Sequence, residues 1–321
     1  MERRLIISNM TNPYYNLALE EYLIERGQAC LYLWQNNKTI VIGRNQNPYR
    51  ECNIERIRAD GINLVRRRSG GGAVYHDLGN LNFTIISKLG EDNIQENFKL
   101  VNRALARLGI KSEFNGRNDI LVGTRKISGN AFYEDGDIFC QHGTLLIDLD
   151  IDRLGNYLTV SKLKLESKGI KSVKSRVSNL KDLDQSISVA RVKEALIAEY
   201  GGQELEPIYY KRQDLEGQPR LMDKVRKYGS WDWVYGESPE SNMGLEKKYD
   251  WGIINFDFLL GAGKILRASI DTDSIIEDNF QALARGLEGL DFRSENIVET
   301  IERYIGNPAI RQDLVNEFKN I

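Results

Sequence analysis

The sequence contains few of the residues on which metal sites and thiol chemistry depend. Histidine occurs twice and cysteine three times in 321 residues. These numbers are too small for a zinc site built from regularly spaced ligands. Cys30, Cys52 and Cys140 are odd in number and lack the spacing of a disulfide framework, which favours a reducing compartment. We therefore expect a cytoplasmic protein without a dedicated metal site.

Several nucleotide-binding and membrane signatures are also missing. No Gly-x-x-x-x-Gly-Lys-Ser/Thr motif is present, so a P-loop is excluded, and no Gly-x-Gly-x-x-Gly motif joins an early strand to a helix. Ser69 lacks the preceding glycine of a nucleophile elbow. No apolar stretch approaches the roughly 18–20 residues of a membrane span. A formal net charge of −2 gives the molecule no general attraction for nucleic acid or membranes.

The residues that are present suit a globular protein with two unequal domains. Hydrophobic residues make up 41% of the chain and charged residues 28%, so a full core can be buried. Residues 236–242 are rich in glycine, serine and proline, which is typical of a linker. Strand-like and helix-like segments alternate before this stretch, and strands precede helices after it. We predict a catalytic domain over residues 1–242 and an accessory domain over residues 247–321, with a linker at about 236–246.

Hydrophobic periodicity locates the main elements of both domains. Predicted helices cover residues 17–24, 94–108, 189–200, 275–287, 295–305 and 308–318. Predicted strands cover residues 31–34, 39–43, 81–86, 119–122, 125–127, 143–147, 251–260 and 264–270. The strands at 31–34 and 39–43 are expected to pair across the polar turn at residues 35–38. Those at 119–122 and 125–127 are expected to pair across Gly123-Thr124.

Residues 66–83 hold the strongest functional signal, because three arginines run into three glycines and His76 follows. Glycine lets the backbone approach a ligand closely, and its exposed N–H groups can hold a carboxylate or phosphate. Arginine supplies a planar, permanent charge for the same anions. In an extended segment Arg66 and Arg68 share one face and Arg67 the other, so one or two of them should reach a ligand. A simple tight turn is the alternative for the three glycines.

Two further residues and one segment are weaker candidates. Lys126 alternates with Ile127 in a predicted strand, which suits either a lysine facing phosphate in a cleft or a solvated surface lysine. His142 begins an apolar strand, where a structural role competes with a catalytic one. Residues 161–176 are rich in lysine and form either a solvated face or a basic loop that closes over phosphate.

Four segments together resemble the lipoate–protein ligase A family in order and spacing. They are residues 66–83, 117–131, 142–149 and 156–180, and the likeness extends through Ser230-Trp231-Asp232-Trp233 to the C-terminal region. The arginine-serine-triple-glycine signature combined with the lysine motif is specific, and the resemblance covers nearly the whole chain. It implies an α+β fold, with a mixed-sheet catalytic domain of the biotin/lipoate ligase type, helices packed on the sheet, and a small α+β C-terminal accessory domain.

The resemblance implies an enzyme that activates free lipoate with ATP and Mg²⁺ to lipoyl-AMP and releases pyrophosphate. The lipoyl group then passes to a specific lysine on a partner protein. The implied partners are lipoyl domains of 2-oxoacid dehydrogenase acyltransferase subunits and the glycine-cleavage H protein. No nucleic-acid or membrane partner is implied, and we expect a monomer.

The same resemblance implies roles for individual residues. Lys126 is implied to touch both the lipoate carboxylate and the α-phosphate, and Asp119 or a phosphate oxygen is a candidate base for the acceptor lysine. The implied ATP- and adenylate-binding residues are Arg67, Gly72, Ala73, Val74, Tyr75, Asn118, Lys126 and Lys174. The implied lipoate-binding residues are Ser69, Gly70, Gly71, His76, Lys126 and His142. Residues 163–180 correspond to the family's adenylate-binding loop.

Two other functions stay open at this point. A lipoyl or octanoyl transferase without its own activation step would carry the acyl chain as a thioester on a cysteine nucleophile. Residues 113–117, which precede the lysine motif, contain no cysteine, and Cys140 is predicted to be a buried, inert strand residue. A non-catalytic binder of lipoyl proteins is the second alternative.

Overall fold

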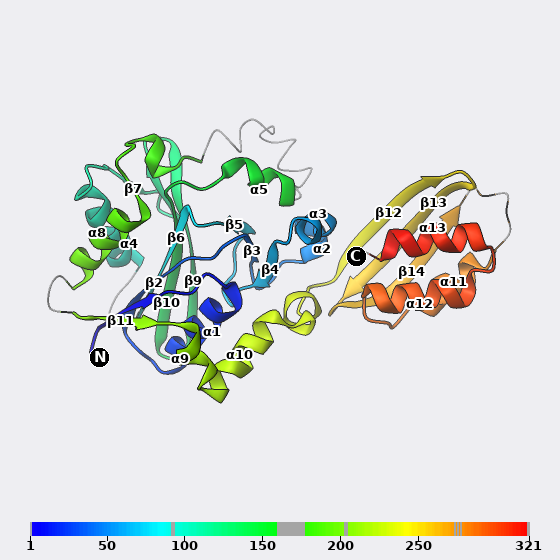
Figure 1. Cartoon of the computed structure of the whole chain (residues 1–321), viewed down its shortest axis with the longest axis horizontal. Coiled ribbons are helices and arrows are strands. Elements are labelled where there is room, and N and C mark those ends of the chain that lie inside the picture. The colour runs from blue at the N-terminus through cyan, green and yellow to red at the C-terminus, as the bar shows by residue number, and fades with distance from the viewer. Residues whose placement is uncertain are drawn as a thin grey trace. The chain divides into compact units, whose positions relative to one another are not determined.

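The computed structural model describes residues 2–90, 94–158, 177–201, 205–272, 274, 276 and 278–319. The chain divides into two compact units (Figure 1). The first is drawn from Met1–Arg44, Ile62–Asn156 and Val160–Gly229, and the second from Asn45–Gly61, Tyr157–Thr159 and Ser230–Ile321. Each unit has its own hydrophobic core. Within these described ranges, no helix has the length and apolar character needed to cross a bilayer.

A mixed sheet of eight strands forms the centre of the first unit. In sheet order the strands are β11 (Pro207–Tyr210), β1 (Arg4–Ser8), β2 (Cys30–Trp34), β6 (Asn80–Lys88), β10 (Ile138–Leu146), β9 (Arg125–Asp135), β8 (Asp119–Val122) and β7 (Glu113–Phe114). Strand β1 runs parallel to both neighbours, and the pairs from β2 through β7 are antiparallel. The predicted hairpin between β8 and β9 is confirmed.

One face of this sheet is apolar and packs against two helices. Leu31 and Leu33 of β2 and Phe83 of β6 enter a core that also includes Phe98 of α4 (Ile94–Ala106) and Leu196 of α8 (Val189–Tyr200). Successive side chains of a strand point to opposite faces. The residues that alternate with these leucines and phenylalanines therefore point to the other face of the sheet.

Helix α1 (Pro13–Glu25) lies on that second face. Asn12 caps the helix by accepting a hydrogen bond from the backbone of Tyr14, and Pro13 begins its first turn. Tyr32 of β2 donates its hydroxyl to Asn16 Oδ1 at 3.1 Å. A layer of polar contacts thus joins α1 to the sheet. The remaining elements of this unit are α5 (Ile151–Tyr157), the 3₁₀ helix η1 (Leu180–Asp182), α9 (Arg212–Glu216) and α10 (Pro219–Gly229).

A smaller three-stranded sheet carries the glycine segment. Strand β3 (Thr39–Ile42) pairs in parallel with β4 (Asn63–Arg66) and antiparallel with β5 (Val74–His76). The three glycines lie in the connection from β4 to β5. The predicted pairing of β2 with β3 is wrong, because both edges of β2 are occupied by β1 and β6.

The second unit combines an antiparallel sheet with helices on it. Its strands are β12 (Ser241–Tyr249), β13 (Gly252–Gly261) and β14 (Lys264–Thr272), and its helices are α2 (Pro48–Glu51), α3 (Ile54–Ala59), the π-helix η2 (Asp232–Gly236), α11 (Phe280–Leu287), α12 (Ser294–Tyr304) and α13 (Pro308–Phe318). Strand β12 occupies residues that we predicted as the end of a linker, and α11 begins at Phe280, later than predicted. The predicted α+β class is confirmed for both units.

Candidate active site

Two cross-strand rows of the large sheet form the floor of a cavity. The register places Asn82 of β6 between Trp34 of β2 and Thr144 of β10. Two residues further along the same strands, and therefore on the same face, Thr84 pairs with His142. Trp34, Asn82, Thr144 and His142 all line a cavity of about 190 Å³. Strand register thus fixes the positions of the floor residues.

The cavity gathers most of the residues predicted for the site. Those on its wall are Arg67, Gly71, Gly72, Ala73, Val74, His76, Asn118, Lys126 and His142. Ser69, Gly70, Tyr75 and Asp119 are described by the structure but do not form part of the wall. Ser69 and Asp119 contact wall residues directly, as set out below. Lys174 and residues 161–176 lie outside the described residues.

The three consecutive arginines have three different environments. Arg66 is fully buried and donates to two backbone carbonyls after β3. Arg68 places its guanidinium over the ring of Tyr133, with its Cζ 4.6 Å from the ring centroid. Arg67 alone of the three lines the cavity. This agrees with the alternation expected for an extended segment.

Arg67 holds the glycine segment in shape. Its Nε donates to Ser69 Oγ at 3.0 Å, and its Nη2 donates to the carbonyls of Gly70 (2.7 Å) and Gly72 (2.9 Å). Its Nη1 donates to a carbonyl of β3. Burial lowers the pKa of Arg67 to about 10, although the negative charge of Glu20 opposes this. Because each guanidinium nitrogen already has a protein acceptor, direct contact of Arg67 with a nucleotide stays a prediction.

The glycine segment also lies directly against the end of strand β3. A Cβ atom on Gly43 would lie 2.1 Å from the carbonyl oxygen of Gly71, so a side chain there requires the backbone to move. Gly71 has φ 96°, in the left-handed region that favours glycine. The backbone N–H of Arg44 donates to the carbonyl of Ser69 at 2.8 Å. These contacts give the connection one defined conformation.

Lys126 and Asp119 form an ion pair at the cavity. The Lys126 Nζ lies 2.7 Å from Asp119 Oδ1, and 34% of the lysine side chain is exposed. The ammonium group lies directly over Gly129, because a Cβ atom on that glycine would be 2.8 Å from Nζ. Asn118 is fixed beside them through its carbonyl, which accepts from the Asn130 backbone at 2.8 Å. The hairpin of β8 and β9 therefore presents a partly exposed cation to the cavity.

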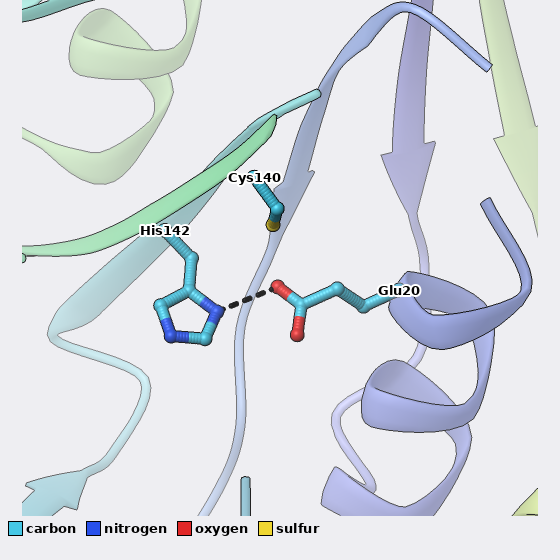
Figure 2. Close-up of side chains that lie close together, drawn as sticks. All are labelled: Glu20, Cys140 and His142. Atoms are coloured by element: carbon cyan, nitrogen blue, oxygen red, sulfur yellow. Dashed lines mark hydrogen bonds and ion pairs between the residues drawn. The ribbon is translucent and has the colours of Figure 1, made fainter. Parts of the chain in front are cut away.

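Figure 2 shows a carboxylate–imidazole pair, formed by the buried Glu20 of α1 and the partly buried cavity residue His142. Glu20 Oε1 and His142 Nδ1 are 3.0 Å apart. On the other side of the ring, His142 Nε2 lies 2.6 Å from Ser69 Oγ. Burial alone would raise the pKa of Glu20, but the charge and hydrogen bond of His142, the hydrogen bond of Thr84 and the charge of Arg67 lower it overall. Glu20 is therefore an ionised carboxylate in the interior.

Cys140 lies next to this pair (Figure 2). Its Sγ, a Glu20 oxygen and a His142 nitrogen lie within 4.8 Å of one another, which is close enough to be considered as a metal site. However, burial raises the pKa of Cys140 far above its ordinary value, and the negative charge of Glu20 adds to this. A metal would need the thiolate, and Glu20 and His142 are already bonded to each other. The geometry therefore favours a neutral, buried thiol.

Comparison with protein families identifies the group to which this fold and site belong. Residues 12–201 match the lipoyl protein ligase A/B catalytic domain, and residues 238–320 match the bacterial lipoate protein ligase C-terminus. The chain belongs to the lipoate–protein ligase family. The lipoate–protein ligase A of Psychrobacter cryohalolentis is 37% identical to it over 314 residues, which cover 92% of this chain and 91% of that protein.

Solved lipoate ligases share the fold. The crystal structure of P. falciparum LipL1 in complex with lipoate is 28% identical, has a TM-score of 0.66 and covers 100% of both chains. A lipoate–protein ligase A bound with ATP is 26% identical, with a TM-score of 0.60 over 74% of this chain and 100% of that chain. The bipartite lipoate protein ligase of Thermoplasma acidophilum, solved in a study of that ligase and its E2 lipoyl domain, is 26% identical, with a TM-score of 0.63 over 74% of this chain and 97% of its own.

Several wall residues of this lipoate ligase carry no motif in the sequence. They include Leu17, Trp34, Asn82, Asn130 and Thr144. Glu20 was also missed, although a signal was present: it is an acidic residue within the apolar stretch at residues 17–24 of the predicted first helix. Acidic residues are rarely buried without a partner. A carboxylate on the buried face of a helix therefore indicates a partner elsewhere in the chain.

Proposed function

We propose that this chain is an ATP-dependent lipoate–protein ligase with two half-reactions. In the first, the lipoate carboxylate attacks the α-phosphate of Mg²⁺–ATP, which forms lipoyl-AMP and releases pyrophosphate. In the second, the ε-amine of an acceptor lysine attacks the carbonyl carbon of lipoyl-AMP, and AMP leaves. Support comes from the likeness to the P. cryohalolentis ligase and to ligases solved with lipoate and with ATP.

One observation carries this proposal: a lysine ammonium group and a fixed glycine connection line the same cavity as apolar side chains. Lys126 and Gly71-Gly72 share that wall with Leu17, Trp34 and Val41. Attack of a carboxylate on a phosphate brings two anions together, so their repulsion must be neutralised by fixed positive groups. The apolar side chains provide a surface for the hydrocarbon part of lipoate. A cavity with both features suits an apolar carboxylic acid that is activated by a nucleotide.

The residue roles are part of the same proposal. Lys126 neutralises the lipoate carboxylate and the α-phosphate, and Asp119, its ion-pair partner, is a candidate base for the acceptor lysine. Adenylate contacts are proposed for Arg67, Gly72, Ala73, Val74, Tyr75, Asn118 and Lys174. Lipoate contacts are proposed for Ser69, Gly70, Gly71, His76 and His142. Tyr75 is buried away from the wall, so its contact would have to come from its backbone.

We propose lipoyl domains as the acceptor, as in the archaeal system that comprises a lipoate ligase and its E2 lipoyl domain. The acceptor belongs to a 2-oxoacid dehydrogenase or is the H protein of glycine cleavage. We assign the cavity-bearing first unit as the catalytic domain and the second unit as the accessory domain.

A thioester-based transferase is disfavoured by the environment of the cysteines. Cys30, Cys52 and Cys140 are all described and all buried. Burial raises the pKa of each thiol well above its ordinary value. A cysteine nucleophile needs a lowered pKa or an adjacent free base and must reach the substrate. None of the three lines the cavity within the described part of the chain.

Two measurements test the proposed function. The protein, mixed with Mg²⁺–ATP and labelled pyrophosphate, should exchange label into ATP only when lipoate is present. With ATP, lipoate and an isolated lipoyl domain, mass spectrometry should find a lipoyl adduct on one lysine of that domain. Transfer from supplied lipoyl-AMP without any exchange would leave only a transferase, and a protein that did neither would be a binder.

A further inference from the structure

A continuous line of hydrogen bonds connects Arg67 to the interior of helix α1. The Arg67 Nε donates to Ser69 Oγ at 3.0 Å, and Ser69 Oγ lies 2.6 Å from His142 Nε2. His142 Nδ1 lies 3.0 Å from Glu20 Oε1. Ser69 and Glu20 are 1% and 5% exposed, so water has little access to these bonds. The line joins the start of the glycine segment to a buried carboxylate.

A second branch reaches the same carboxylate from the sheet. The Trp34 Nε1 donates to Thr84 Oγ1 at 3.0 Å, and Thr84 Oγ1 donates to Glu20 Oε1 at 2.6 Å. Glu20 therefore accepts hydrogen bonds from both sides. Three members of the two branches line the cavity: Trp34, His142 and Arg67.

The direction of each proton in this network follows from the chemistry of its members. An ionised carboxylate only accepts hydrogen bonds, so Glu20 requires a proton on His142 Nδ1. When this is the only proton on the ring, Nε2 is an acceptor and takes the hydroxyl proton of Ser69. The Ser69 oxygen is left to accept from the Arg67 guanidinium, which can only donate. One buried negative charge thus determines the donor at His142 Nδ1, and the short 2.6 Å contact favours His142 Nε2 over the Gly70 carbonyl, 3.5 Å away, as the acceptor for Ser69 Oγ.

We propose that Glu20 is a positioning residue of this enzyme: it keeps a proton on His142 Nδ1 and thereby fixes the ring, Ser69 and the glycine segment from Gly70 to Gly72. Glu20 itself does not line the cavity in the described structure. It acts through His142, Thr84 and the residues bonded to them. The kinetic part of the inference rests on the proposed lipoate ligase activity, whereas its structural part does not.

Nuclear magnetic resonance of the imidazole nitrogens tests the structural part directly, because the chain has only two histidines. In alkaline solution the ¹⁵N shifts of His142 should show a protonated Nδ1 and an accepting Nε2. His142→Gln assigns the signal. A protonated Nε2 on His142 in the unaltered protein would overturn the inference, whether or not the protein catalyses any reaction.

Two substitutions of Glu20 separate its hydrogen-bonding role from its volume. Glu20→Met keeps a similar length but leaves His142 Nδ1–H and the Thr84 hydroxyl without an acceptor. The His142 proton should then move to Nε2. Glu20→Gln keeps an oxygen acceptor at this position, so it should preserve the Nδ1–H tautomer and restore most of the activity that the methionine variant loses.

The kinetic expectation is a change in KM for lipoate rather than in kcat. Glu20→Met should raise that KM by about tenfold or more, the effect of leaving buried donors unpaired. At saturating lipoate, kcat should stay within about threefold of its normal value, because Lys126 is not part of the network. The KM for lipoate should be lowest in the unaltered protein, higher in Glu20→Gln and highest in Glu20→Met.

Glu21→Met provides the matched control. Glu21 is the next residue of α1 and is also a 5% exposed carboxylate, but its close partners are Lys224 and Lys227 on α10, with Arg68 at 4.0 Å, and in the described structure it does not contact His142 or Thr84. This variant should lose stability and keep both the His142 tautomer and the KM for lipoate. Equal kinetic effects of Glu20→Met and Glu21→Met would reduce Glu20 to a structural residue and overturn the inference.

Failure of the proposed function is a separate outcome. If even the unaltered protein shows no lipoate-dependent exchange, the proposed function fails, while the tautomer result still decides the role of Glu20.

Discussion

His76 is kept neutral by its burial and by a chain of buried amides that begins in helix α1. Asn16 Nδ2 donates to Asn36 Oδ1 at 3.0 Å, which turns the Asn36 amide nitrogen toward His76 Nδ1, 3.3 Å away. His76 Nδ1 is therefore an acceptor, and the proton lies on Nε2. Burial, reinforced by the positive charge of Arg67, lowers the pKa of His76 to about 3. With the Nδ1–H form proposed for His142, the two histidines of the chain have opposite tautomers.

This depressed pKa predicts a pH dependence of stability. In the unfolded chain His76 titrates near its ordinary pKa of 6.5, whereas the folded protein does not protonate it until about pH 3. As pH falls through this window the unfolded state binds the extra proton, so His76 should lower the free energy of unfolding by roughly 1.4 kcal/mol per pH unit. In His76→Gln, which can still accept from Asn36, denaturant titrations between about pH 6 and pH 4 should show a shallower decline. An unchanged slope would contradict a buried neutral His76.

Lys126→Ala tests the proposed neutralisation of charge. The variant should lose about 100-fold or more of the lipoate-dependent pyrophosphate exchange, as is typical when a preorganised donor is removed. Its thermal midpoint should change little, because 34% of the lysine side chain and 23% of the Asp119 side chain are exposed. Lys181→Ala, which breaks an exposed ion pair with Asp148, should leave exchange intact. Near-normal exchange in Lys126→Ala would remove this residue from the mechanism.

At the scale of single residues, the sequence predicted the side to which a side chain points better than it predicted hydrogen-bond partners. The period-two alternation at residues 66–68 separates Arg67 from Arg66 and Arg68, and the structure agrees. The partner of Glu20, however, is His142, 122 residues away. No local pattern specifies such a contact, because it depends on how α1 packs on the sheet.

At the scale of elements, the end of β3 and the glycine connection depend on each other. Gly43→Ala would place a Cβ atom 2.1 Å from the Gly71 carbonyl oxygen, and a backbone atom cannot move aside as a flexible side chain can. We expect a loss of about 1–3 kcal/mol in the free energy of unfolding and a higher KM for lipoate. Gly155→Ala in α5 is the control, since open space surrounds that position and alanine favours a helix. A fully stable, fully active Gly43→Ala would show that the connection can adopt another conformation.

The elements themselves were largely predictable, but their pairing was less so. The hairpin of β8 and β9 followed from a Gly-Thr turn between two short strands, and Gly123 has the expected positive φ of 60°. Strands β2 and β3 are buried at every position, so their patterns carry no information on which neighbour each one pairs with. The turn between them suggested a hairpin, and long-range pairing of β2 with β1 and β6 prevailed.

At the scale of the whole molecule, the second unit is not continuous in sequence. Composition predicted an accessory domain at residues 247–321 after a linker at about 236–246, and the second compact unit also includes Asn45–Gly61. Tyr49 of α2 contributes an aromatic contact to this unit, because its ring lies 4.8 Å from Phe292 and 5.2 Å from Tyr235. A short helix embedded in the first half of the chain shows no linker composition at either end. Sequence patterns therefore could not assign it to the C-terminal unit.

Tyr49→Ala should accordingly destabilise the second unit, although Tyr49 lies far in sequence from the other parts of that unit. The substitution removes the edge-to-face contact with Phe292 and the hydrogen bond from the Tyr49 hydroxyl to the Phe292 carbonyl (2.9 Å), for a loss of about 2–3 kcal/mol. Tyr49→Phe keeps the ring and should lose only about 1 kcal/mol. Hydrogen exchange should become faster in β13, β14 and α12, while the amides of β2 and β6 keep their protection.

Tyr209→Ala is the control, at a 54% exposed tyrosine of β11. It should leave hydrogen exchange unchanged in both groups of elements. If Tyr49→Ala instead accelerated exchange only within α2 and α3, this segment would be an independent appendage rather than part of the second unit.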